Sequence, residues 1–141
     1  MKSIPLILAP LAQISQVSSE KLHVENNRIK DEDGRERIFH GTNVVQKLFP
    51  YVPRIDGFNA IDSFSKEDAE FLATMGYNTI RLGVLWAGAE PVEGKFNQTY
   101  FDQIKEIVKF SSEAGVYPLL DMHQDVWSRK FCGEGVPDWA A

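Results

Sequence analysis

The stretch PLLDMHQDVWSRKFCGEGVPDW, residues 118–139, decides the fold. It begins as an apolar run and ends in polar and aromatic residues: His123, Gln124, Asp125 and Trp127. A continuous apolar run is typical of a parallel strand that is buried on both faces. Ligands bind beyond the carboxyl ends of such strands. We therefore predict a buried strand over 116–122 with a functional edge after it. The alternative is that His123 and Asp125 only cap the strand.

Two further strands are predicted upstream. Residues 38–45 indicate a buried strand that enters a loop rich in aromatic residues and proline, and residues 79–86 indicate a second strand that ends in Trp86. Residues 87–96 are predicted to be a loop. Polar groups are predicted at the ends of all three strands: Asn43 and Lys47, Arg81 and Trp86, and His123 and Asp125.

Two amphipathic helices separate the three strands. Ser65, with an acidic residue three positions later, predicts a capped helix that stops at Gly76. Its apolar face comprises Ala69, Leu72 and Met75. Residues 99–114 place apolar side chains at helical spacing and are followed by the terminator Gly115. The order is therefore that of repeated β/α units.

A small β-hairpin is predicted before the first strand, over residues 22–38. Asn26-Asn27 separates two short alternating segments, and a second turn ends at Gly34. Asp-Gly between alternating segments is a good turn signal.

Two α/β architectures accept this order: an open doubly wound sheet, or the first units of a (β/α)8 TIM barrel. A nucleotide-binding sheet would carry a glycine-rich phosphate loop after its first strand, and neither GxGxxG nor GxxxxGK occurs in the sequence. The barrel is therefore favoured. A complete barrel needs about 250 residues and eight strands. We expect the 141 residues to be an N-terminal part of one, with about three β/α units.

Composition narrows the class of partner. The chain is 43% hydrophobic and 25% charged, which is ordinary for a globular protein. Its net charge of −5 provides no basic surface, so we expect neither nucleic acid nor an anionic membrane as partner.

Residues 1–19 are predicted to be a secretory signal, because Met1-Lys2 precede a short apolar run that gives way to small polar residues. A disordered apolar leader is the alternative. A signal would send the protein to a secreted or lysosomal destination. No run approaches the roughly 18 apolar residues of a membrane-spanning helix.

Three smaller features bear on modification and metal binding. Asn97-Gln98-Thr99 is a glycosylation sequon, usable only in the secretory route, and Asn97 could equally cap a helix. Cys132 is the only cysteine, so no internal disulfide can form. We expect no cofactor and no metal, because the three histidines are scattered and no HExxH motif occurs.

Four motifs carry a family resemblance. They are FHGTNVV (39–45), GYNTIRLGVLW (76–86), AEPVEGKFN (89–97) and LDMHQDVWSRKFCGEGVPDWA (120–140). Together they resemble the N-terminal part of endoglycoceramidases, in the cellulase-like glycoside hydrolase family 5. The last motif is the most specific. The resemblance covers residues 22–141, and it implies that residues 20–141 form the incomplete N-terminal portion of a glycosidase TIM barrel.

The resemblance implies a retaining hydrolase that cleaves the β-glycosidic bond between an oligosaccharide and ceramide, with two glutamates about 5 Å apart. In this family the acid/base glutamate follows the fourth strand and the nucleophile the seventh. Neither segment is found in the sequence, so we expect both catalytic glutamates to lie beyond Ala141. We therefore expect this chain alone to be inactive, and to fold poorly because strand edges and the inner barrel face would be exposed.

The resemblance also implies roles for residues of the substrate site. Arg81 matches the arginine that supports the nucleophile and keeps it ionised. His123 and Asp125 match the pair that holds sugar hydroxyls, and Lys47 matches the lysine that reaches the same sugar. Trp86 and Trp127, with Tyr51, offer aromatic faces to a sugar or an acyl chain, or pack at the rim.

Five other acids are expected to be structural or solvated rather than catalytic: Glu90, Glu93, Asp121, Glu134 and Asp138. The expected partner is a glycosphingolipid or oligosaccharide, with transient contact to membrane lipid. Two alternatives remain open: another family 5 enzyme, acting on glucosylceramide or a β-glucan, and a non-catalytic module that only binds sugar.

Overall fold

The computed structural model describes residues 21–141, so the predicted signal lies outside the described residues. The elements along this part of the chain are β1 (His23–Glu25), β2 (Arg28–Lys30), β3 (Gly41–Val44), α1 (Lys66–Thr74), β4 (Thr79–Val84), α2 (Trp86–Ala89), α3 (Gln98–Glu113), β5 (Tyr117–Met122) and the short 3-10 helix η1 (Arg129–Phe131).

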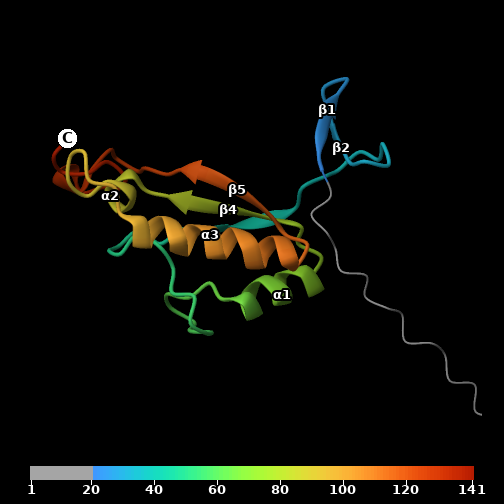
Figure 1. The fold of residues 1–141 in the computed structure, drawn as a ribbon, viewed down its shortest axis with the longest axis horizontal. Coiled ribbons are helices and arrows are strands. Elements are labelled where there is room, and N and C mark those ends of the chain that lie inside the picture. The colour runs from blue at the N-terminus through green and yellow to red at the C-terminus, as the bar shows by residue number, and fades with distance from the viewer. Residues whose placement is uncertain (1–20) are drawn as a thin grey trace, which may run out of the picture.

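Strands β3, β4 and β5 form one parallel sheet in that order, which confirms the predicted β/α repeat. Asn43 of β3, Arg81 of β4 and Leu119 of β5 stand in one row across the sheet. Because the strands are parallel, their carboxyl ends meet at the same edge. Figure 1 shows α2 and the C-terminal loop gathered at this edge.

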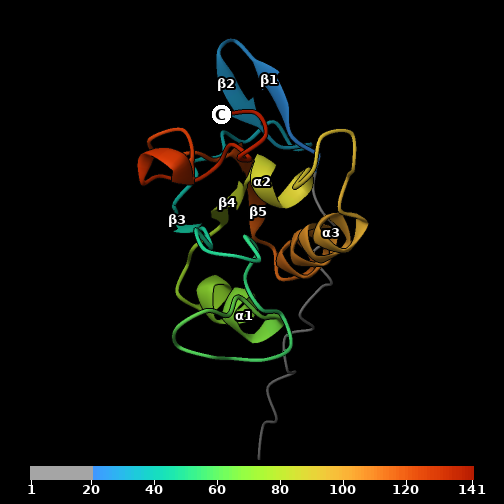
Figure 2. The same cartoon turned by 90° about the vertical axis from the view of Figure 1, so that its left-hand side faces the viewer.

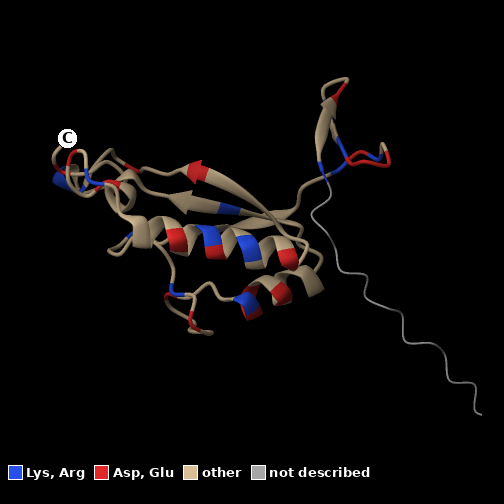
Figure 3. Cartoon of the chain, viewed as in Figure 1, with Lys and Arg blue, Asp and Glu red and all other residues tan. Residues whose placement is uncertain are grey.

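Helices α1 and α3 cover one face of the sheet (Figures 1 and 2). Side chains alternate across a strand, so Ile80 and Leu82 of β4 point to the same face. Both are fully buried, and they share the core cluster with Ile104 and Ile107 of α3 and with Ala69 of α1. In Figure 3 both helices carry acidic residues (red) and basic residues (blue) along their length.

The prediction of fully buried strands over 38–45 and 116–122 is wrong for the two outer strands. Asn43 is exposed, and Leu119, Leu120 and Met122 are 63%, 55% and 74% exposed. The reason is position, because within residues 21–141 only β4 has a strand on each side and helices over its face. Apolar runs at the edges therefore remain open on at least one side.

Both predicted helices form, with caps close to the predicted ones. The backbone N–H of Ser65 donates to the Asp68 carboxylate at 2.8 Å, and the Asn97 side chain accepts from the N–H of Tyr100 at 3.2 Å. Asn97 is therefore the N-cap of α3, in agreement with the alternative role considered for the sequon. Met75 was expected on the buried face of α1 but is 61% exposed, since it already lies at the C-cap.

The predicted hairpin also forms. Strands β1 and β2 pair antiparallel, and Asn26 and Asn27 adopt φ of 51° and 60°, as a tight hairpin turn requires. Asp31 is buried in the following turn, where it accepts the N–H groups of Asp33 and Arg35 at 3.0 and 2.9 Å. The hairpin stands at the end of the sheet opposite the C-terminal loop (Figure 1).

One predicted loop is partly helical. Residues 86–89 form α2 directly after β4, so Trp86 begins a helix rather than ending a strand. Leu85 and Tyr100 fasten this corner, because the N–H of Leu85 donates to the buried Tyr100 hydroxyl at 2.9 Å. Burial raises the pKa of that hydroxyl. Among residues 21–141, every helix is too short or too polar to cross a bilayer.

Candidate functional site

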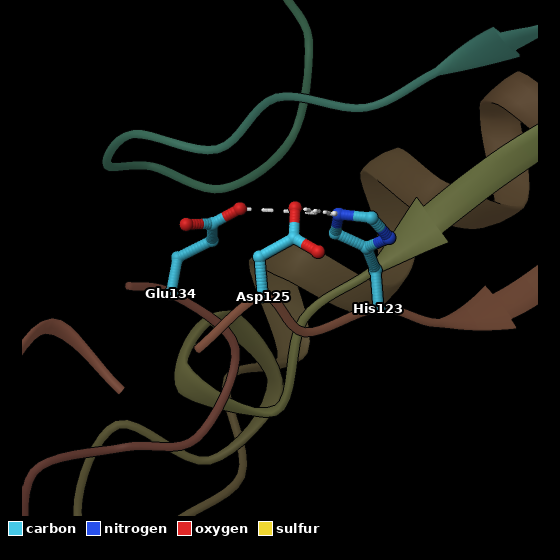
Figure 4. Close-up of side chains that lie close together, drawn as sticks. All are labelled: His123, Asp125 and Glu134. Carbon is cyan, nitrogen blue, oxygen red and sulfur yellow. Dashed lines mark ion pairs between the residues drawn. The ribbon is translucent and has the colours of Figure 1, made fainter. Parts of the chain in front are cut away.

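Polar side chains from segments far apart in the sequence meet at the carboxyl edge of the sheet. Lys47 follows β3 and forms ion pairs with Asp125 and, at 2.8 Å, with Glu134. His123 follows β5, and its Nε2 atom lies 3.5 Å from the Asp125 carboxylate. Figure 4 shows His123, Asp125 and Glu134 in a row with their polar ends directed toward one another.

Arg81 joins this group from a different place than predicted. It is the third residue of β4 and not its end, so the predicted position is wrong by three residues. Its long side chain still reaches the site, because Nη2 lies 2.7 Å from Asp121 and 3.5 Å from Nδ1 of His123. Asp121 lies within β5, where the sequence predicted a polar contact rather than catalysis.

His123 is the most enclosed member of the site, with 7% of its surface exposed. Its Nδ1 atom lies 3.0 Å from the Asp121 carboxylate. Among the described residues, Nε2 has no hydrogen-bond partner, although two carboxylates lie 3.5 and 3.9 Å away. One side of the imidazole is therefore held by the protein, and the other faces the cluster of Asp125, Glu134 and Lys47.

Glu134 joins the cluster although it was not among the predicted site residues. It was expected to be structural or solvated, yet its side chain is only 16% exposed and it shares Lys47 with Asp125. A usable signal was present, because Gly133 and Gly135 on either side of it indicate a tight backbone approach.

The loop after β5 sets the spacing between the two carboxylates. The N–H of Asp125 donates to the Glu134 carbonyl at 3.0 Å, and the N–H of Glu134 donates back at 2.9 Å. This isolated antiparallel pair brings two residues from opposite ends of the loop side by side. A hydrogen bond of 2.8 Å from the N–H of Ala87 to the Gly135 carbonyl ties the loop to α2.

Gly133→Ala is expected to disturb the site without touching a charged group. A Cβ atom at residue 133 would lie 2.0 Å from the carbonyl oxygen of Asp125, so the backbone pair with Glu134 must shift. A misplacement near 1 Å can cost about 100-fold in rate. In the full-length protein we expect a fall of that order in kcat/KM. Gly34→Asn, in the hairpin, is the control because nothing lies within 4 Å of its Cβ position and asparagine tolerates its positive φ of 76° better than most residues. Equal activity of both variants would contradict the prediction.

Charges in the cluster stabilise one another. The hydrogen bonds of Lys47 to Asp125 and Glu134 raise the pKa of its ammonium above 10.5, and Lys47 holds the pKa of Asp125 below 3.8. Asp125 contributes stability that is lost as pH falls through its lowered pKa. Lys47 contributes stability that is lost as pH rises through its raised pKa. The pair is therefore charged across the whole range between these limits.

Lys47→Met is expected to raise the pKa of Asp125 relative to the unmodified protein, because it removes the hydrogen bond and charge that lower it. Carboxyl ¹³C NMR titration measures this, with the Asp125 signal assigned from its absence in Asp125→Asn. Lys66→Met, on α1, is a matched control whose ammonium pairs with Glu70 instead. An unchanged Asp125 pKa in Lys47→Met would show that the ion pair does not persist in solution.

A metal fits this cluster poorly. His123, Asp125 and Glu134 offer three ligand atoms within 4.8 Å of one another, a donor set that prediction did not anticipate. Imidazole and carboxylate are zinc ligands in general. Here, however, the Lys47 ammonium already contacts both carboxylates. A cation would have to displace it, so the chemistry of the cluster is that of an ion-pair network. That the site needs no metal stays a prediction.

Two of the other acids have structural partners, as predicted. Glu90 accepts hydrogen bonds from Trp86 Nε1 and from the N–H of Gly94, both at 2.8 Å. Asp138 pairs with Arg129 at 2.7 Å. Glu93 is exposed.

The last residue of the sequence contacts η1. The Lys130 ammonium donates to the backbone carbonyl of Ala141 at 2.9 Å, and this contact ties the last residue to η1. The carboxylates that surround Lys47 and His123 are Asp121, Asp125 and Glu134, each of which has a cationic or imidazole partner. The prediction that both catalytic glutamates lie beyond Ala141 is not tested by these contacts, and it stays a prediction.

The three aromatic residues predicted for the site have different surroundings. Trp86 packs edge-on against Trp139, with ring centres 5.4 Å apart, and donates to Glu90, which are contacts of rim packing. Trp127 is 52% exposed, and its role as an aromatic platform stays a prediction. Tyr51 lines a hollow of about 230 Å³ that also contains Glu134.

Comparison with known proteins decides the family. The model of the cellulase family, glycosyl hydrolase family 5, matches residues 41–139. The chain belongs to glycosyl hydrolase family 5. This match includes every predicted site residue, from Lys47 to Trp127.

Individual relatives within family 5 show which of its members this chain resembles. An endoglycoceramidase of Hydra vulgaris is 46% identical over 99% of this chain and 27% of its own length. The crystal structure of an endogalactoceramidase matches 85% of the chain and 30% of its own, with a TM-score of 0.70 at 29% identity. The ganglioside GM3 complex of endo-glycoceramidase II from Rhodococcus sp. matches 78% of the chain and 26% of its own, with a TM-score of 0.61 at 30% identity.

The predicted fold is confirmed by these structural matches. The chain has the parallel strands and covering helices of the N-terminal part of a family 5 barrel. It spans about a quarter of the length of the endoglycoceramidase it matches in sequence.

Proposed function

We propose that the full-length protein hydrolyses the β-glycosidic bond between the oligosaccharide and the ceramide of glycosphingolipids. This chain contributes the part of the site that holds the sugar. The observation that carries the proposal is the meeting of Lys47, Arg81, His123 and Asp125 at one edge of the sheet. Identity of 46% to an endoglycoceramidase over nearly the whole chain supports this choice of substrate class.

The cluster has the chemistry that sugar hydroxyls require. A hydroxyl both donates and accepts, and here Asp125 can accept while the Lys47 ammonium donates. Both side chains are about half exposed, so they remain open to a ligand. Hydrogen bonds to charged groups are stronger than those between neutral groups, so two of them favour one orientation of a sugar ring.

Catalysis itself is assigned in this proposal to two glutamates beyond Ala141. In a retaining glycosidase one carboxylate attacks the anomeric carbon while the other protonates the leaving oxygen, and then activates water to release the sugar. In this scheme Arg81 holds the nucleophile in its ionised form, because a guanidinium is permanently charged and offers five donors. The residues described here bind and orient.

Incubation of the full-length protein with ganglioside, glucosylceramide and a cellooligosaccharide tests the proposal. We expect release of intact oligosaccharide and ceramide from the ganglioside, detected by mass spectrometry. Cleavage of glucosylceramide or the glucan alone would replace the substrate with that of another family 5 enzyme. Binding of oligosaccharide without cleavage of any substrate would favour a non-catalytic sugar-binding module.

Asp125→Ala tests, in the same assay, whether Asp125 belongs to the substrate site. Removing the carboxylate takes away a hydrogen-bond acceptor for the sugar and leaves Lys47 with Glu134 alone. We expect both a higher KM and a lower kcat. Asp138→Ala is the matched control, because Asp138 is a half-exposed loop aspartate that pairs with Arg129 instead. An Asp125→Ala variant that matches this control would remove Asp125 from the substrate site.

A further inference from the structure

Asp121 joins two residues of the site through a single oxygen. Its Oδ2 atom lies 2.7 Å from Arg81 Nη2 and 3.0 Å from His123 Nδ1. Its side chain is only 25% exposed, so both contacts are partly shielded from water. Asp121 therefore constrains the imidazole from the side that faces away from Lys47, Asp125 and Glu134.

The geometry selects one tautomer of His123. A neutral imidazole has one N–H donor and one acceptor nitrogen, and an ionised carboxylate only accepts. The 3.0 Å contact with Asp121 is a hydrogen bond only if Nδ1 carries the proton. Arg81 is a donor too, but its Nη2 is nearer to Asp121 than to Nδ1, at 2.7 against 3.5 Å. The shorter contacts are all satisfied by the Nδ1–H form.

Nε2 of His123 is then an acceptor without a donor. The residue is 7% exposed, and Nε2 has no hydrogen-bond partner among residues 21–141. Its near neighbours are the carboxylate oxygens of Asp125 and Glu134, at 3.5 and 3.9 Å, and these are acceptors as well. Buried polar atoms are rarely left unsatisfied. A ligand that brings a hydroxyl group would supply the missing donor.

We propose that Asp121 is a positioning residue that holds His123 as the Nδ1–H tautomer, so that Nε2 accepts a hydrogen bond from a hydroxyl of the bound sugar. The tautomer follows from the contacts of Asp121, Arg81 and His123 alone. The identification of the donor as a sugar hydroxyl rests on the proposed function. A second partner that fixes the tautomer of a functional histidine is a general device of enzyme sites.

Nuclear magnetic resonance tests the tautomer directly. In the full-length protein with ¹⁵N-labelled imidazoles, long-range ¹H–¹⁵N correlations distinguish a protonated from an unprotonated ring nitrogen, and His123→Gln identifies the signal. At mildly alkaline pH we expect a protonated Nδ1 and an unprotonated Nε2. The opposite tautomer, or a ring protonated on both nitrogens, would overturn the proposal without reference to any substrate.

Two substitutions of Asp121 separate positioning from charge. Arg81 and His123 share one oxygen of Asp121, and Arg81 can only donate. In Asp121→Asn the amide oxygen is therefore expected to take that place and keep the Nδ1–H signal. Asp121→Ala removes the acceptor and should lose it. An Asp121→Ala variant that retains Nδ1–H would show that another group sets the tautomer.

Kinetics of the same variants test the consequence for the sugar. We expect Asp121→Ala to lower kcat/KM about 10- to 100-fold, as loss of such partners does elsewhere, and Asp121→Asn to recover most of it. Asp102→Ala, an exposed aspartate on α3, should be unchanged. Equal losses in the Asn and Ala variants, or none in either, would overturn the positioning role. If the unmodified protein cleaves no glycolipid, the proposed function fails, while the tautomer measurement still decides the role of Asp121.

Discussion

Arg81→Ala in the full-length protein is expected to lower kcat by about 100- to 1,000-fold while KM changes only a few-fold, because loss of the guanidinium leaves the proposed nucleophile less ionised and poorly oriented for the chemical step. In the structure Asp121 engages Nη2 of Arg81 at 2.7 Å. A guanidinium has five donors, so others remain for the carboxylate nucleophile of the proposed function. Measurement of kcat and KM on the released oligosaccharide checks this.

Two further variants sharpen the Arg81 experiment. Arg81→Lys keeps the charge but not the planar fork, so it should recover only a small part of the lost rate. Arg28→Ala removes an arginine from the hairpin, where its partner is Glu36, and should leave turnover unchanged. Turnover of Arg81→Ala close to that of Arg28→Ala would remove Arg81 from the catalytic site.

Leu82→Ala is expected to lower the free energy of unfolding by about 2–5 kcal/mol, the usual range for truncating a buried leucine. Leu82 is fully buried in β4, the one strand of the three-stranded sheet with neighbours on both sides. Its loss leaves a cavity beneath α1 and α3 that the surrounding core can close only in part. Urea denaturation of the full-length protein, followed by circular dichroism, measures the change.

The matched control for Leu82 is Leu48→Ala, which removes the same atoms from a side chain that is 75% exposed. Substitutions at such positions usually change stability by less than about 0.5 kcal/mol. If Leu82→Ala costs no more than Leu48→Ala, β4 is not the centre of the core.

Local signals were sufficient for most of the fold. The Ser65 and Asn97 caps lie where the sequence placed them, and the turn at Asn26-Asn27 forms with the positive φ angles that a tight hairpin needs. Each of these signals acts within a few residues of itself. The burial of β3 and β5 was predicted wrongly, since burial depends on which other segments lie over a strand.

In the candidate site, too, some features followed from the sequence and others depended on the fold. The residue types at Lys47, Arg81, His123 and Asp125 pointed to a polar edge by their chemistry and spacing. The contact of Asp121 with Arg81 did not follow from the sequence, because it depends on the register between β4 and β5. Glu134 was missed because its approach to Asp125 depends on the path of the whole loop between them.

The amino-acid sequence by itself determined the alternation of strands and helices and the polar residues that accompany the strands, since these rest on periodicity, caps and residue chemistry. The tertiary structure alone decided that Asp121 contacts Arg81 and that Glu134 shares Lys47 with Asp125. Both facts join residues that are distant along the chain, and only the packing of β4 against β5 and the folding of the last loop bring their oxygen and nitrogen atoms within hydrogen-bonding range.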